Sequence, residues 1–123
     1  MRAGSDAHVT CYGYMQARAY NNISDARLKK DIQECKINAI KLIKDGKVYN
    51  YKFKDTNKEE FGLVIGEGYK CPQEIVDKND EIYSINSYRM ASILWKAIQE
   101  QQEQIEQLQK EIKELKGEKN EQN

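Results

Sequence analysis

Ser24 and Lys29 are the two residues of this sequence whose types and spacing could support catalysis. A serine hydroxyl is a poor nucleophile until a base removes its proton, and a lysine can act as that base if burial leaves its amine neutral. Ser–Lys pairs are a known variant of the Ser–His arrangement. The only histidine, His8, lies near the N-terminus, so a histidine-based triad is nearly excluded.

The spacing of this pair is a weak signal when it is taken alone. Lysine is common in the chain, so a lysine five residues after a serine needs no functional explanation. The other serines are followed at that offset by Thr10, Arg89, Ser92 and Ala97. In the structural alternative, Ser24 and Asp25 cap a turn and Lys29 is a solvated charge. The residues by themselves leave both interpretations open.

The composition excludes several classes of function. Lys plus Arg and Asp plus Glu number 20 each, so the chain has no general attraction for nucleic acid or an anionic membrane. No apolar run approaches the length of a membrane span, and no signal peptide is visible. Cys11, Cys35 and Cys71 form no CxxC motif, which favours unpaired thiols in a reducing cytoplasm. We expect no metal site and no cofactor.

The elements that must position the pair are short. We expect a helix around residues 39–43 that ends near Gly46, and an alternating strand over residues 48–53 with Tyr49, Tyr51 and Phe53 on one face. A buried strand over residues 61–66 should pair with it as a hairpin. Pro72 should open a helical turn through Val76, followed by a turn at 77–80 and a last strand at 82–85. Residues 9–15 favour a strand completed by other chains.

A long helix should follow from Ser87 to near Lys116, capped by Asn86 or Ser87. Its first half should pack on the small body, with Trp95 and its neighbours as the anchor. Its second half has a heptad pattern, with isoleucines at position a and leucines at position d. These are Ile98, Ile105 and Ile112 at a, and Leu94, Leu108 and Leu115 at d, with Gln101 in the remaining d position. Such a helix should associate with copies of itself, and isoleucine at a with leucine at d leans toward two strands.

Residues 24–32 read SDARLKKDI and closely resemble the SDxRLKxxI signature of a known domain family. It is the self-cleaving intramolecular chaperone domain at the C-terminus of endosialidase tailspikes, phage tail fibres and neck-appendage proteins. Later segments are similar in the same order, through 39–43, 48–51, 61–65, 72–76, 83–85 and 94–100. Composition and size are most similar to the neck-appendage proteins. The segment Val64–Ile65–Gly66 departs from the family's pattern, so only Ser24 and Lys29 are carried over as site residues.

The resemblance implies an α+β body over residues 24–86, followed by a helix over 87–118 that forms a homotrimeric coiled coil. It also implies that residues 6–23 end a β-stalk, which is the client. Residues 1–5 themselves are typical of a cloning remnant, and we expect residues 119–123 to fray. Three copies would hold the stalk in register in the cytoplasm of an infected bacterium. Lys29 would then activate Ser24 to cut next to itself, at the bond to Ile23 or to Asp25, and the domain would leave the mature virion protein.

Two alternatives remain. The chain could be a homo-oligomerisation module of a fibrous protein in which the pair is inactive. The same family also occurs in a membrane-tethered eukaryotic transcription factor, but nothing basic or groove-sized is present here to bind DNA.

Overall fold

A computed structural model describes residues 9–78 and 82–121, with side chains described through residue 118. The chain divides into two units, Met1–Gln33 and Glu34–Asn123, and each is described by itself. Over residues 9–33, the described part of the first unit, the one element is the 3-10 turn η1 (Ala26–Leu28), while residues 9–25 form neither helix nor strand and are exposed. Residues 9–15 therefore form no strand with the described residues of their own chain, and the prediction that other chains complete a strand there stays a prediction. The cloning remnant predicted at residues 1–5 lies outside the described residues.

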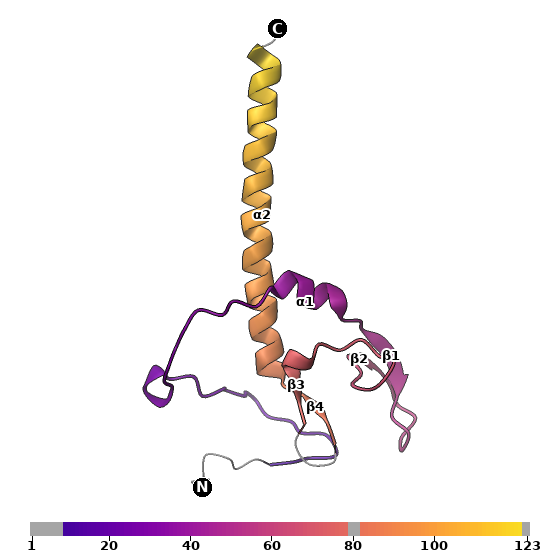
Figure 1. Cartoon of the computed structure of the whole chain (residues 1–123). Helices are drawn as coiled ribbons and strands as arrows, with labels where there is room; N and C mark the ends of the chain where they lie inside the picture. Colours follow the sequence, from indigo (N-terminus) through magenta and orange to yellow (C-terminus); the bar gives the residue numbers. More distant parts are fainter. Residues whose placement is uncertain (1–8, 79–81, 122–123) are drawn as a thin grey trace. The chain divides into compact units, whose positions relative to one another are not determined.

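The second unit is α+β, as predicted. Its elements are α1 (Ala39–Asp45), β1 (Tyr49–Lys52), β2 (Glu59–Gly62), η2 (Gln73–Ile75), β3 (Val76–Asp77), β4 (Ser84–Ile85) and α2 (Ser87–Glu121). β1 pairs with β2 and β3 with β4, both antiparallel, to give two separate two-stranded sheets (Figure 1). None of the helices in the described part of the chain could span a membrane.

Local signals define the start and end of α1. The Asn38 side chain accepts a hydrogen bond from the N–H of Lys41 at 3.2 Å, which satisfies one of the donors left open in a first helical turn. Gly46 ends the helix and donates its N–H to the carbonyl of Ile43. The helix and its end at Gly46 are confirmed.

The hairpin is confirmed, but its second strand is displaced from the predicted position. Tyr49 pairs with Gly62 and Lys52 with Glu59, so β2 begins two residues before the strand predicted over residues 61–66 and ends at Gly62. The loop closes tightly around Asn57, which has a φ of 57°, and this closure sets the register. Phe61 is 73% exposed, so the prediction of a buried strand is wrong there.

The turn at Pro72 is confirmed as η2, and the last strand is shorter than expected, at Ser84–Ile85. Asp77, predicted to lie in a turn, belongs to β3. Of the rest of that turn, residues 79–80 lie outside the described part of the chain.

Asn86 starts α2, as predicted. Its side-chain oxygen accepts the N–H of Arg89 at 2.9 Å, and its own N–H donates to the carbonyl of Ile75 at 2.8 Å. The Arg89 guanidinium binds Asp77 at 3.2 Å. These contacts fix the first turn of α2 to η2 and β3. The helix then continues through Gly117 to Glu121, beyond its predicted end near Lys116.

The core is small. Five apolar side chains are buried among the described residues, those of Ala39, Ile75, Val76, Ile93 and Ala97. All of them except Val76 form one cluster, with six half-buried neighbours: Ile40, Leu42, Leu63, Cys71, Ile85 and Met90. The first half of α2 therefore packs on the body, as expected, through Ile93 and Ala97. Trp95 does not anchor it, because its side chain is 71% exposed. Two residues advance a helix by about 200°, which places Trp95 nearly opposite Ile93.

Candidate functional site

Ser24 and Lys29 are joined by the turn η1. Asp25 caps the turn, and Lys29 ends it by donating its backbone N–H to the carbonyl of Ala26. The turn brings the Lys29 side chain back toward the start of the segment. Lys29 Nζ donates a hydrogen bond to Ser24 Oγ at 2.6 Å, a distance within the range required for proton transfer between a base and a nucleophile.

Asp25 holds the turn and is paired with Arg27. Its carboxylate accepts the backbone N–H of Arg27 at 2.9 Å and the guanidinium Nη2 at 2.7 Å. The guanidinium, followed by the backbone N–H, lowers the pKa of Asp25, and the same pairing raises the pKa of Arg27. The ionised carboxylate is thus the form that caps η1. Asp25 therefore caps a turn, as the structural alternative expected.

The segment around the pair is open to solvent. Ser24 and Lys29 are exposed, and so is Ile23, whose carbonyl carbon is the nearest candidate for attack. The apolar side chains of Ile23, Leu28 and Ile32 are 82%, 75% and 67% exposed. A neutral lysine amine needs desolvation, and the segment's own residues do not provide it. The arrangement has the Lys29–Ser24 hydrogen bond that a Ser–Lys dyad needs, but neither side chain is buried.

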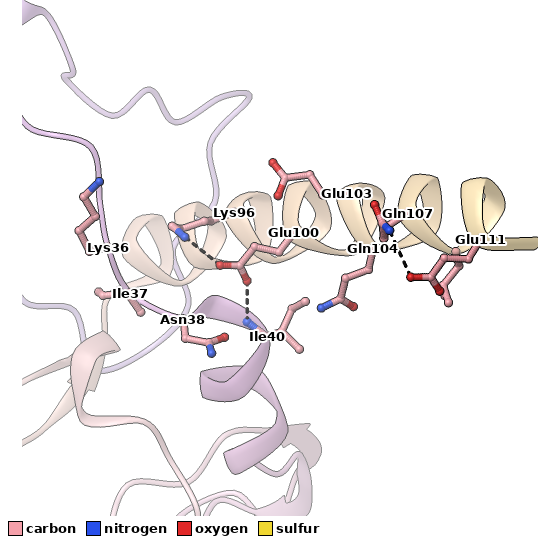
Figure 2. A pocket seen from close by; sticks show the side chains of 11 residues that line it. Lys36, Ile37, Asn38, Ile40, Lys96, Glu100, Glu103, Gln104, Gln107 and Glu111 are labelled. Atoms are coloured by element: carbon pink, nitrogen blue, oxygen red, sulfur yellow. Dashed lines mark hydrogen bonds and ion pairs between the residues drawn. The ribbon is translucent and has the colours of Figure 1, made fainter. Parts of the chain in front are cut away.

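A second cluster of polar contacts lies in the other unit, where α1 meets α2. Figure 2 shows the Glu100 carboxylate between the Lys96 ammonium and the first turn of α1. Lys96 Nζ donates to it at 2.8 Å, and the N–H groups of Ile40 and Ala39 donate at 3.0 and 3.4 Å. Glu100 thereby satisfies open donors at the α1 N-terminus, where a negative charge is also favoured by the helix dipole.

The electrostatics of this cluster favour the charged forms. The hydrogen bond from Lys96, followed by that from the Ile40 N–H, lowers the pKa of Glu100. The same bond raises the pKa of Lys96. The sequence offered the i,i+4 spacing of Lys96 and Glu100 as a signal for their pairing. It gave no signal that Glu100 also caps α1, because that contact spans 60 residues.

The groove beside this cluster has a volume of about 900 Å³. Carboxylate and amide side chains of α2, including Glu103, Gln104, Gln107 and Glu111, form most of one wall. Gln107 donates to Glu111 at 3.1 Å, one turn away. Within the described residues, no group of three or more His, Cys, Asp and Glu side chains could hold a metal ion. All three cysteines are unpaired thiols, as expected, and burial raises the pKa of Cys71.

The heptad positions of α2 are uncovered. Those positions are Leu94, Ile98, Ile105, Leu108, Ile112 and Leu115, which are 43–66% exposed. We call these six residues the α2 seam. Apolar side chains that repeat in this way on a polar helix normally pack against another helix.

Residues 24–67 match the family model of the chaperone of endosialidase, Peptidase_S74. The match begins at Ser24, includes Lys29 and ends after β2, so it covers less than half of the chain. It supports the resemblance, and with it an intramolecular chaperone role. The similarities in residues 72–100 lie outside this match, and a phage origin stays a prediction. No curated protein and no solved structure matches the chain.

Proposed function

We propose that this chain is an intramolecular chaperone that trimerises, assists the folding of a β-stalk on its N-terminal side, and then releases itself by autoproteolysis at Ser24. The observation that carries the catalytic part is the 2.6 Å contact from Lys29 Nζ to Ser24 Oγ, within the segment that matches the chaperone of endosialidase family. The client would be a phage tailspike or appendage protein.

The chemistry begins when Lys29, as a neutral amine, takes the proton of Ser24 Oγ. The oxygen attacks the carbonyl carbon of Ile23, which is close because it belongs to the peptide that precedes Ser24. The Ile23–Ser24 C–N bond breaks, and the proton passes from Lys29 to the released Ser24 amine. An ester now joins Ile23 to Ser24 Oγ. Water hydrolyses it, which frees the stalk with a carboxylate at Ile23 and restores the hydroxyl. Cleavage between Ser24 and Asp25 is the alternative.

Assembly would switch this reaction on. The exposed apolar side chains of Ile23, Leu28 and Ile32 flank the dyad, so a folded stalk or a neighbouring copy that covers them would also desolvate the Lys29 amine. Desolvation favours the neutral form that the reaction needs. A chain that has not assembled would keep its stalk attached.

The α2 seam would hold the copies together. A stalk of intertwined strands has many wrong registers and a high contact order, which makes folding slow. Holding three chains together at the C-terminal side of the stalk raises their effective concentration and removes much of that search. Cleavage then removes the folding aid, so that the finished stalk is trapped kinetically.

The test uses a chain that carries its stalk. Ser24→Ala and Lys29→Ala should each slow release by about 10²-fold or more, since each removes a group that acts directly in proton transfer or bond formation. Lys30→Ala is the matched control, because it removes a neighbouring lysine outside the pair, and should be processed like the parent. Mass spectrometry of the products follows release and identifies the bond that breaks. Normal processing of either dyad variant would contradict the proposal.

The second candidate is an oligomerisation module with an inactive pair. The exposure of Ser24 and Lys29 favours it, because the described residues do not provide the buried surroundings that such a pair needs. In that case the parent chain with its stalk would trimerise but stay intact.

A further inference from the structure

An apolar groove of about 510 Å³ lies beside the first turns of α2. The hairpin, the end of α1 and η2 form its other walls, with Val48, Phe61, Leu63 and Pro72 among the lining residues. Val48 and Phe61 are 68% and 73% exposed. Contact between these apolar walls and water is unfavourable, so covering the groove would lower the free energy.

The α2 side of this groove has a defined place in the heptad. With Ile98 at position a, the groove is lined by Met90 at g, Ile93 at c and Leu94 at d. The body covers the c and g flank of the helix, where Ile93 and Ala97 are buried. The opposite flank, with Trp95 at position e, is open. The groove therefore lies at the edge where the body meets the α2 seam, and Leu94 belongs to both.

In a parallel coiled coil, a g residue of one helix faces the e residue of the following heptad in its neighbour. This pairing places Met90 opposite Trp95 of the next copy. The last such pair, Glu111 with Lys116, is attractive because the two side chains carry opposite charges. The helix thus has one charge-matched pair and one apolar pair at its two ends, both of which fit a parallel arrangement.

We propose that the groove of each copy receives the Trp95 side chain of a neighbouring copy. This inference rests on the proposed oligomerisation through α2. Trp95 is large, apolar and 71% exposed in one chain, and the flank on which it lies is the one that faces the neighbour's groove. A ring between Met90 and the hairpin would bury both surfaces. It would also tie the position of each body to the adjacent helix, so the groove is incomplete until a second copy supplies the ring.

Because Trp95 is the only tryptophan, its fluorescence reports this contact directly. The 123-residue chain should show a blue-shifted emission and a several-fold lower acrylamide quenching constant at concentrations where sedimentation finds the oligomer. Dilution to the monomer should reverse both. An oligomer in which Trp95 stays fully quenchable would overturn this inference and leave the proposed function standing. A chain that is monomeric at every concentration would instead overturn the oligomer itself, and the inference with it.

A variant of the groove wall tests where the ring is buried. Val48→Glu places a charge in the groove at a side chain that is already exposed, so the isolated chain should fold normally. In the oligomer of this variant, the Trp95 emission should be red-shifted and its acrylamide quenching constant should be as high as in the monomer. The matched control is Ile82→Glu, which adds the same charge at a 60% exposed position outside the groove lining and should keep the parent spectrum. An unchanged spectrum in Val48→Glu would place Trp95 elsewhere.

Cross-linking tests the register. In a chain whose three native cysteines are replaced, Met90→Cys with Trp95→Cys should form disulfides between copies on mild oxidation. Met90→Cys with Gln99→Cys, at the outward b position, should not. The first pair could fail to cross-link in a chain that still sediments as an oligomer, while Trp95 is buried in the parent. Trp95 would then be buried against another surface, such as residues 9–15, and the proposal would be refuted.

Discussion

Glu100 joins two helices through one carboxylate. It accepts from the Lys96 side chain of its own helix and from N–H groups at the start of α1. Neither bond links it to Ser24 or Lys29, which lie in the other unit. Its effect is to fix α1 on α2, and hence the hairpin that follows α1.

Glu100→Gln should lower the unfolding midpoint at neutral pH, because an amide binds the Lys96 ammonium less well than a carboxylate does. The folded-state pKa of Glu100 lies below its ordinary value of 4.5, so its contribution is present above that value and lost as pH falls through the folded-state pKa. The midpoints of parent and variant should therefore converge in acid. Thermal unfolding at one fixed chain concentration measures this. Glu103→Gln, which changes a neighbouring carboxylate of the same groove, should show a smaller loss.

Ile75 is a buried residue of the small core. It is 3% exposed, whereas Ile82 is 60% exposed. Ile75→Ala should cost about 2–5 kcal/mol in the free energy of unfolding, because it removes buried methyl groups and leaves a cavity. Ile82→Ala should change it by less than about 0.5 kcal/mol. Denaturant unfolding compares the two, and equal losses would contradict the assigned core.

The helix α2 has two different halves. The first is fixed to the body at Asn86, Ile93 and Ala97, and the second is exposed from residue 101 through residue 118. Figure 1 shows this second half extending past α1 with no other element of its unit against it. An isolated polar helix of this kind is marginal in water, so its apolar seam needs a partner.

Ile105→Lys places a charge at the middle a position of the seam and should convert the oligomer to monomers. The matched control, Glu106→Lys, adds the same side chain at the adjacent b position and should assemble like the parent. Sedimentation velocity at equal concentrations distinguishes the two. An oligomer that survives Ile105→Lys would exclude the seam as the contact between copies.

The elements with strong local signals were the ones that sequence could predict. Asn38 and Gly46 delimit α1, Asn86 starts α2, and alternation marks β1. The displaced β2 depended on how the loop at Asn57 closes, which fixes the register only in the folded hairpin. The exposure of Trp95 depended on which flank of α2 the body covers, and a helix with apolar residues around most of its circumference does not specify that flank.

The candidate site was predicted in part. The signature predicted that Ser24 and Lys29 act together, and their side chains are hydrogen-bonded, while their catalytic role stays a prediction. The two-helix contact of Glu100 was not foreseen, because it depends on tertiary packing between residues distant in the sequence.

At the scale of the whole molecule, assembly and cleavage should be coupled. In a chain with its stalk, the rate of release should rise with chain concentration until the oligomer is fully formed, since only the assembled form would desolvate Lys29. Ile105→Lys should slow release even though it lies far from Ser24 in the sequence, and Glu106→Lys should not. Time courses by mass spectrometry at several concentrations test this. A rate independent of concentration in the parent would mean that each chain cleaves alone.

Five buried apolar side chains are all that the described residues of one chain contribute to a core. So little burial leaves a single copy close to the limit at which folding is favourable. Association of copies would then add to the stability of each folded chain. Once cleavage frees the chaperone from its client and dilutes it, its copies would separate, unfold and become substrates for cellular proteases. The small core would thus give a released domain a short lifetime.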